Sequence, residues 1–160
     1  QNAYPSWLYP VTQGATTIWE RWDGLKPDGS TQTPSMNSYN HYAYGAIGEW
    51  MYNNLLGFKK EESSPGFKKF TLKPLFSEEF SFVKGHYENM YGRIAVEWSQ
   101  DENTITLAFG IPANTQAKLD LSLAKTSNLV LFKSNKKKGT PINAISTLGS
   151  GNYEIILTKE

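Results

Sequence analysis

Glu20 is the residue whose type and surroundings point most directly to chemistry. It lies between Trp19 and Trp22 and next to Arg21. Indole rings pack against the C–H faces of sugar rings, and a carboxylate can take a proton from water. Contact with indoles also removes some water from the carboxylate, which makes it a better acid or base near neutral pH. The pattern is typical of a site that binds and cleaves sugars, although a surface carboxylate paired with Arg21 would give the same sequence.

Two histidines and two further acids complete the set of polar candidates. His41 stands at the start of the clearest predicted helix, where its imidazole can hydrogen-bond a sugar hydroxyl, orient a carboxylate or serve only the structure. His86 has no acidic or aromatic cluster near it in the sequence, and we interpret it as structural. Asp23 and Asp28 each precede a glycine, which favours turns. With two histidines and no cysteine, we expect no metal site, thiolate nucleophile or disulfide.

The bulk composition limits the function classes. The chain has 160 residues, 39% of them hydrophobic, and a net charge of +1. This length suits one domain with a smaller addition, and the balanced charge argues against a nucleic-acid binder. We expect the basic run 136–138 to be a solvated loop and no segment to span a membrane. Because the first residue is Gln1 and not methionine, we expect a processed or longer parent. Its localisation stays open, and secretion or a periplasmic location is compatible.

The elements that must position these residues change character near residue 60. A short helix is predicted over Thr16–Trp22, and a longer one over Ser38–Leu56, because apolar residues from Ala43 to Leu55 recur at helical spacing. The composition of residues 58–66 predicts a polar linker. Alternating segments follow and predict an antiparallel sandwich. The first predicted strand is 70–75, and the second comprises 80–83 and 85–90 and is broken at Gly85. The others are 93–99, 104–111, 117–123, 129–132 and 153–157.

Several motifs together resemble a known family. They are residues 5–7 (PSW), 14–22 (GATTIWERW), 36–50 (MNSYNHYAYGAIGEW), 65–70 (PGFKKF), 91–94 (YGRI) and 111–115 (IPANT). In order and spacing they resemble the C-terminal end of a glycoside hydrolase family 78 α-L-rhamnosidase, from residue 5 to about residue 120.

The resemblance implies a fold and a reaction. The implied fold class is α+β: residues 1–62 would be the last helices of an (α/α)6 barrel, and residues 63–160 a C-terminal antiparallel β-sandwich, jelly-roll-like. The family hydrolyses terminal α-L-rhamnosyl linkages with inversion and without an organic cofactor. Its general base corresponds to Glu20, and its sugar-contacting histidine to His41. We expect Trp19 and Trp22 to be walls of the same substrate pocket.

The resemblance also implies that a second carboxyl group is needed. An inverting glycosidase needs a general acid as well as a base, and in this family the acid lies upstream, in a segment that these 160 residues do not contain. We therefore expect the isolated chain to be inactive. We also expect the apolar stripe of the longer helix to pack on the sandwich, on the missing N-terminal part of the enzyme or on a homodimer partner. The substrates implied are rhamnose-containing glycans or glycosides.

Two other functions fit the sequence less closely. One is a carbohydrate-binding or structural β-sandwich module with a helical arm, in which an aromatic residue such as Trp98 would hold the sugar. The other is a glycosidase with the same (α/α)6 barrel and a different sugar preference. The residues that would decide between sugars are mostly absent from this chain.

Overall fold

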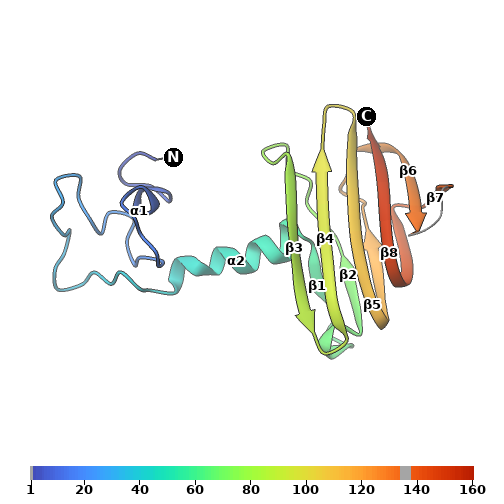
Figure 1. The fold of residues 1–160 in the computed structure, drawn as a ribbon, viewed down its shortest axis with the longest axis horizontal. Helices are drawn as coiled ribbons and strands as arrows, with labels where there is room; N and C mark the ends of the chain where they lie inside the picture. The colour runs from blue at the N-terminus through green and yellow to red at the C-terminus, as the bar shows by residue number, and fades with distance from the viewer. Residues whose placement is uncertain (1, 134–137) are drawn as a thin grey trace. The chain divides into compact units, whose positions relative to one another are not determined.

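The computed structural model describes residues 2–133 and 138–160, so Lys136 and Lys137 of the predicted basic loop lie outside the described residues. The chain divides into two compact units, Gln1–Glu49 and Trp50–Glu160. Strands dominate the second unit, and the described part of the chain has few helices (Figure 1). The domain boundary that we place between residues 62 and 63 stays a prediction.

The N-terminal unit consists mainly of loops around one helical turn, α1 (Tyr9–Thr12). The helix predicted over Thr16–Trp22 is wrong, because this segment forms no helix. Its backbone instead bonds to a later segment: the Glu20 N–H donates to the Ser38 carbonyl at 2.8 Å, and the His41 N–H donates to the Ile18 carbonyl at 2.7 Å. Residues 17–20 therefore lie beside residues 38–41.

The same pairing shortens the second predicted helix. Its helical part starts at residue 43 and not at Ser38, with a 3₁₀ turn η1 (Ala43–Ala46), followed by α2 (Ile47–Trp50) and a π-helical turn η2 (Met51–Leu55). Leu55 is buried, whereas Trp50 and Met51 remain about half exposed. Most of the predicted apolar stripe thus has no covering element in the described structure.

The described residues of the second unit form one eight-stranded sheet. A short 3₁₀ turn, η3 (Pro65–Phe67), precedes its second strand. The strands are β1 (Phe58–Lys60), β2 (Lys69–Leu72), β3 (Phe82–Asn89), β4 (Gly92–Gln100), β5 (Thr104–Asp120), β6 (Thr126–Lys133), β7 (Thr140–Pro141) and β8 (Ile145–Lys159).

Strand β5 is the centre of this sheet. The main path runs β1-β2-β5-β8-β6-β7, and β4 also pairs with β5 and carries β3 on its other side. The antiparallel expectation fails at one pair, because β2 and β5 run parallel. Parallel neighbours need a long crossover, and the chain between β2 and the paired part of β5 contains β3 and β4.

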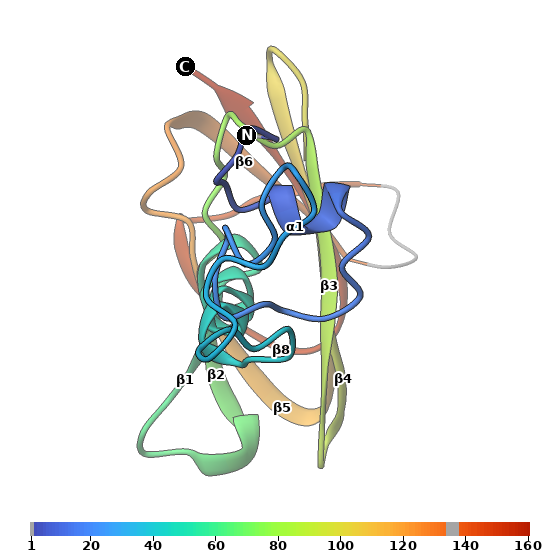
Figure 2. The ribbon, with the colours of Figure 1, turned by 90° about the vertical axis from the view of Figure 1, so that its left-hand side faces the viewer.

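An irregularity between Ile111 and Gln116 divides β5 into two parts. Its first part pairs with β4, its second part pairs with β2, and β8 follows both. In Figure 2, β1 and β2 lie apart from β3 and β4, with β5 between them. Side chains from both parts belong to one hydrophobic cluster, which includes Phe70, Leu72, Ile94, Val96, Trp98, Leu107, Leu119, Ile155 and Leu157.

The start of the second unit is anchored into this core. The Trp98 indole N–H, fully buried, donates to the Leu55 carbonyl at 2.9 Å. Gly57 follows with φ +79°, and a Cβ atom there would lie 2.2 Å from the Pro74 nitrogen. The chain can turn from η2 into β1 at this point only because Gly57 has no side chain.

Several strand predictions need correction. The segments 104–111 and 117–123, predicted as separate strands, join into the single strand β5, which ends at Asp120. The break predicted at Gly85 is absent, because Gly85 continues β3 and its missing Cβ makes room for the Leu56 side chain. Residues 58–60, predicted as part of a linker, form β1 with Phe58 in the core. Strand β8 begins at Ile145, eight residues before its predicted start, so that it follows β5 across the irregularity.

Candidate functional site

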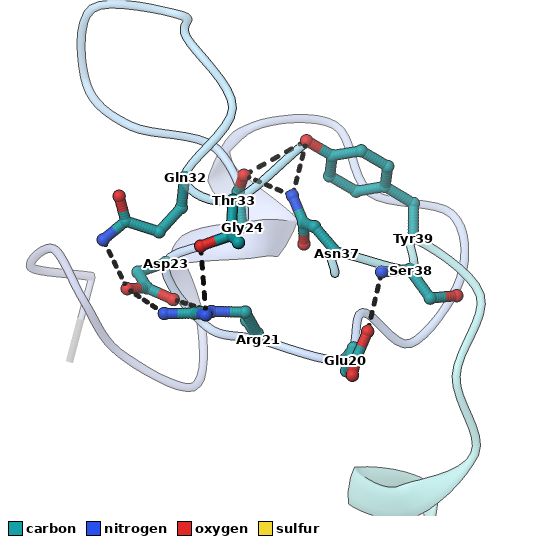
Figure 3. A network of polar contacts seen from close by, with 9 residues as sticks. All are labelled: Glu20, Arg21, Asp23, Gly24, Gln32, Thr33, Asn37, Ser38 and Tyr39. Atoms are coloured by element: carbon teal, nitrogen blue, oxygen red, sulfur yellow. Dashed lines mark hydrogen bonds and ion pairs between the residues drawn. The ribbon is translucent and has the colours of Figure 1, made fainter. Parts of the chain in front are cut away.

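Glu20 is held by a reciprocal contact with Ser38. The Ser38 N–H donates to Glu20 Oε2 at 2.8 Å (Figure 3). This bond adds to the one from the Glu20 N–H to the Ser38 carbonyl. The side chain of Glu20 is half-buried. Within residues 2–133 and 138–160, no hydrogen bond reaches Oε1. One oxygen is thus fixed, and the other remains able to accept a proton.

His41 lies on the segment paired with that of Glu20. Its backbone N–H bonds to Ile18, two residues before Glu20. Its Nδ1 accepts a hydrogen bond from the Ala43 N–H at 3.2 Å, and its ring stacks on Tyr42 with centroids 5.2 Å apart. An acceptor role for Nδ1 leaves the proton on Nε2, which can then donate to a ligand oxygen.

Trp19 and Trp22 both line an apolar pocket of about 340 Å³, whereas Glu20 and His41 do not line it. Trp19 is buried and meets Tyr39 edge-on, with centroids 4.8 Å apart. Trp22 is 39% exposed and stacks on Tyr44 at 5.3 Å. The structure therefore places the two indoles in one hollow and the two polar candidates outside it.

Arg21 forms an ion pair with Asp23 and not with Glu20. Its Nε donates to Asp23 Oδ1 at 2.9 Å, and Gln32 Nε2 adds a bond to Oδ2 at 3.1 Å (Figure 3). The hydrogen bond from Arg21 holds the pKa of the Asp23 carboxyl below its usual value, and the same bond raises the pKa of Arg21. Arg21 is thereby engaged in fixing the loop and forms no ion pair with Glu20.

A second polar cluster fixes the loop that leads to Ser38. The Asn37 side-chain amide donates to the Gly24 carbonyl at 2.8 Å, and the Tyr39 hydroxyl donates to the same carbonyl at 3.1 Å. These contacts flank Ser38 on both sides. The sequence offered no sign of this role for Asn37 and Tyr39, because the contact is made to a backbone atom thirteen to fifteen residues away.

Two other residues singled out from the sequence serve the structure, and His86 lies on the surface. Trp98 is completely buried, so the indole proposed for the module alternative cannot reach a sugar. Asp28 accepts bonds from the Ser30 N–H and hydroxyl, as expected for a turn. His86 is exposed on β3 and lines a hollow on the outer face of the sheet.

Among the described residues, no group of three or more histidine and acidic side chains is placed to hold a metal ion. In the same part of the chain, no helix has the length and apolar character needed to cross a bilayer.

The chain matches two family models. Residues 1–55 match the bacterial alpha-L-rhamnosidase 6 hairpin glycosidase domain, and residues 57–135 match the bacterial alpha-L-rhamnosidase C-terminal domain.

Individual relatives carry the same name. The alpha-L-rhamnosidase of Streptomyces avermitilis is 40% identical over 119 residues, which is 74% of this chain and 11% of that protein. An alpha-L-rhamnosidase of Formosa agariphila is 34% identical over 144 residues, which is 90% of this chain and 15% of that protein. The chain thus spans a small part of the length of these relatives.

Solved structures give a similar result. The chain resembles the S. avermitilis alpha-L-rhamnosidase complexed with L-rhamnose, with a TM-score of 0.75 and 32% identity over 98% of this chain and 15% of that one. The alpha-L-rhamnosidase of Aspergillus terreus gives a TM-score of 0.73 and 28% identity over 98% of this chain and 16% of that one. From both family models and from these relatives, we conclude that the chain belongs to the bacterial α-L-rhamnosidases, a family of glycoside hydrolases.

Proposed function

We propose that this chain is the C-terminal part of an inverting α-L-rhamnosidase and that Glu20 is its general base. One observation carries the assignment. Glu20 Oε2 is held by the Ser38 N–H, whereas Oε1 accepts no bond from any described residue. A general base needs this arrangement, because one oxygen must keep its position while the other takes a proton from the attacking water.

The reaction divides between this chain and the rest of the enzyme. Glu20 Oε1 removes a proton from water as the water attacks the anomeric carbon, and the glycosidic oxygen leaves on the opposite face. The leaving oxygen needs a proton from a carboxylic acid roughly 6.5–9.5 Å from the base in an inverting enzyme. We propose that this acid belongs to the upstream segment that the family resemblance implies.

His41 fits a role in holding the sugar. With Nδ1 engaged by the Ala43 N–H, its Nε2–H can donate to a sugar hydroxyl. Trp19 and Trp22 are less well placed for this purpose, since the pocket that they line does not include Glu20. We propose His41 as the sugar contact and Trp22, the more exposed indole, as a wall at the edge of the site.

The exposed apolar side chains support completion by further barrel hairpins. Ile47, Trp50 and Met51 are each more than 40% exposed, and three successive apolar residues of one stripe are seldom left to water. The relatives are several times longer than this chain, and the model that matches residues 1–55 is that of a six-hairpin domain. We propose that the remaining hairpins cover this stripe and that the isolated chain does not hydrolyse rhamnosides.

A chimera tests the assignment of Glu20. This chain replaces the matching C-terminal region of the S. avermitilis enzyme, and release of nitrophenol from an aryl α-L-rhamnoside is measured. Glu20→Gln should lower kcat by roughly 10²–10⁴-fold, because the amide cannot take a proton. Glu49→Gln, the same change at an exposed position of the same unit, should leave kcat essentially unchanged.

Three outcomes would contradict the proposal. They are full activity of the Glu20→Gln chimera, release of α-L-rhamnose with retained configuration in a proton NMR assay, and robust turnover by the purified 160-residue chain alone.

A further inference from the structure

The outer face of the sheet carries a groove that the rhamnosidase reaction does not use. It has a volume of about 310 Å³ and spans β3, β4, β5 and β8. The core-facing side chains of these strands, such as Val96 and Ile155, are buried. Successive side chains of a strand point to opposite faces of the sheet. The residues between the core-facing ones therefore form the groove on the other face.

The floor of the groove is flat because its side chains are very small. Ala95 on β4 pairs with Gly110 on β5, and Ala108 lies two residues before Gly110. On one side Ala95 pairs with His86, and on the other Gly110 pairs with Asn152. One row across the four strands therefore has a polar residue at each end and two very small residues between them. The strand spacing places its two polar ends roughly 14 Å apart.

The two polar ends of the row have free hydrogen-bonding groups. In the described part of the chain, neither the His86 imidazole nor the Asn152 side-chain amide has a hydrogen-bond partner. Asn152 leans over the floor, since a Cβ atom at Gly110 would lie 3.0 Å from its Oδ1. An amide and an imidazole both donate and accept, which suits hydroxyl groups.

The charged residues of the groove are engaged with one another. Lys84 Nζ lies 2.8 Å from Glu97 Oε2, and Arg93 is paired with Glu88 on the neighbouring strand. These pairs neutralise the charges that line the groove, and Glu154, which pairs with Ala108 at its edge, adds a negative charge that disfavours a phosphate or a carboxylate. A ligand that is uncharged, rich in hydroxyl groups and flat on one C–H face fits such a lining.

We propose that this groove binds a neutral saccharide, with a sugar ring lying over Ala95, Ala108 and Gly110 between His86 and Asn152. The groove is a non-catalytic site on the second unit. Its existence does not depend on Glu20. Only the further step, that the saccharide belongs to the glycan cleaved by the same enzyme, rests on the proposed function.

The test is a titration of the ¹⁵N-labelled 160-residue chain followed by amide chemical shifts. The probes are L-rhamnose, a neutral rhamnose-containing disaccharide, glucuronate and inorganic phosphate. We expect a neutral sugar to shift the amides of β4, β5 and β8 around Ala95, Gly110 and Asn152. No shift with either neutral sugar, or tighter binding of glucuronate or phosphate, would overturn the proposal.

Matched variants locate the binding. Ala95→Leu fills the floor and should weaken binding by at least roughly tenfold, whereas Ser99→Leu, on the same face of β4 beyond the groove, should not. His86→Ala and Asn152→Ala remove exposed groups with little risk to folding and should each weaken binding roughly fivefold. If Ala95→Leu and both alanine variants bind the sugar as well as the wild type does, the saccharide does not bind in this groove.

The experiments can contradict the saccharide-binding proposal and the catalytic proposal independently of each other. An active chimera that loses activity with Glu20→Gln but shows no saccharide shifts on β4 and β5 contradicts only the groove. Saccharide binding that disappears with Ala95→Leu, in a chimera whose activity does not depend on Glu20, contradicts only the catalytic assignment.

Discussion

Replacing Trp98 by phenylalanine tests how the second unit is held together. Trp98 is fully buried, and its indole N–H donates to the Leu55 carbonyl at 2.9 Å. Phenylalanine keeps an aromatic ring but removes this donor, so the Leu55 carbonyl remains buried without a partner. Leaving such a group unpaired costs about 1–3 kcal/mol. The smaller ring also leaves space beside Phe76, whose ring meets Trp98 edge-on at 5.4 Å.

The two effects add to a measurable loss of stability. Incomplete filling of the space contributes roughly another 1–2 kcal/mol, so that Trp98→Phe should lower the free energy of unfolding by about 2–5 kcal/mol. Urea unfolding followed by far-ultraviolet circular dichroism measures this directly, and an unchanged dependence on urea concentration shows that the compactness of the states is the same.

Trp50→Phe is the matched control. It is the same substitution in the same unit, at a side chain that is 45% exposed, and it should change stability by less than about 0.5 kcal/mol. If Trp98→Phe and Trp50→Phe unfold at the same urea concentration, the buried hydrogen bond does not stabilise the unit as described.

Two further predictions concern stability. Bonds from Ser122, then from Lys73, lower the pKa of Asp120 to about 2 from 3.8. Because the folded pKa is the lower one, this contribution is present above about pH 4 and is lost as the pH falls towards 2. At pH 7, the free energy of unfolding in urea should be about 1–2 kcal/mol higher for the wild type than for Asp120→Asn. An equal difference at pH 2.5 would contradict this. Gly57→Ala should destabilise the chain by more than about 2 kcal/mol in thermal unfolding, because the new methyl meets the Pro74 backbone at a positive φ. Gly149→Ala, which meets no atom within 4 Å, should be far milder, and equal losses would refute the argument.

The sequence predicted the strands whose two faces differ in polarity. Ile94, Val96 and Trp98 alternate with polar residues and lie in β4 as expected. The first half of β8 was missed because Gly149 and Gly151 interrupt any alternation. This segment is a strand because it continues the pairing with β5, which local sequence does not reveal.

The N-terminal unit was harder to predict for a different reason. The segment 16–22 has side chains that suit a helix, but its backbone groups bond to residues 38–41. A pairing across some twenty residues leaves no periodic pattern in the sequence. The candidate base itself came from its aromatic neighbours and the family resemblance. The contact from Ser38 that holds it is made by a backbone N–H, which any residue except proline would supply.

The position of β8 in the sheet has a consequence for how the protein is made. β8 is the last strand of the sheet to be synthesised, yet it lies between β5 and β6. On the ribosome, β6 can pair with β7, but neither strand can join the rest of the sheet until β8 has left the exit tunnel. Until then, the long edge of β5 is open to other chains. We therefore expect the second unit to complete its sheet only after residue 159 has left the tunnel.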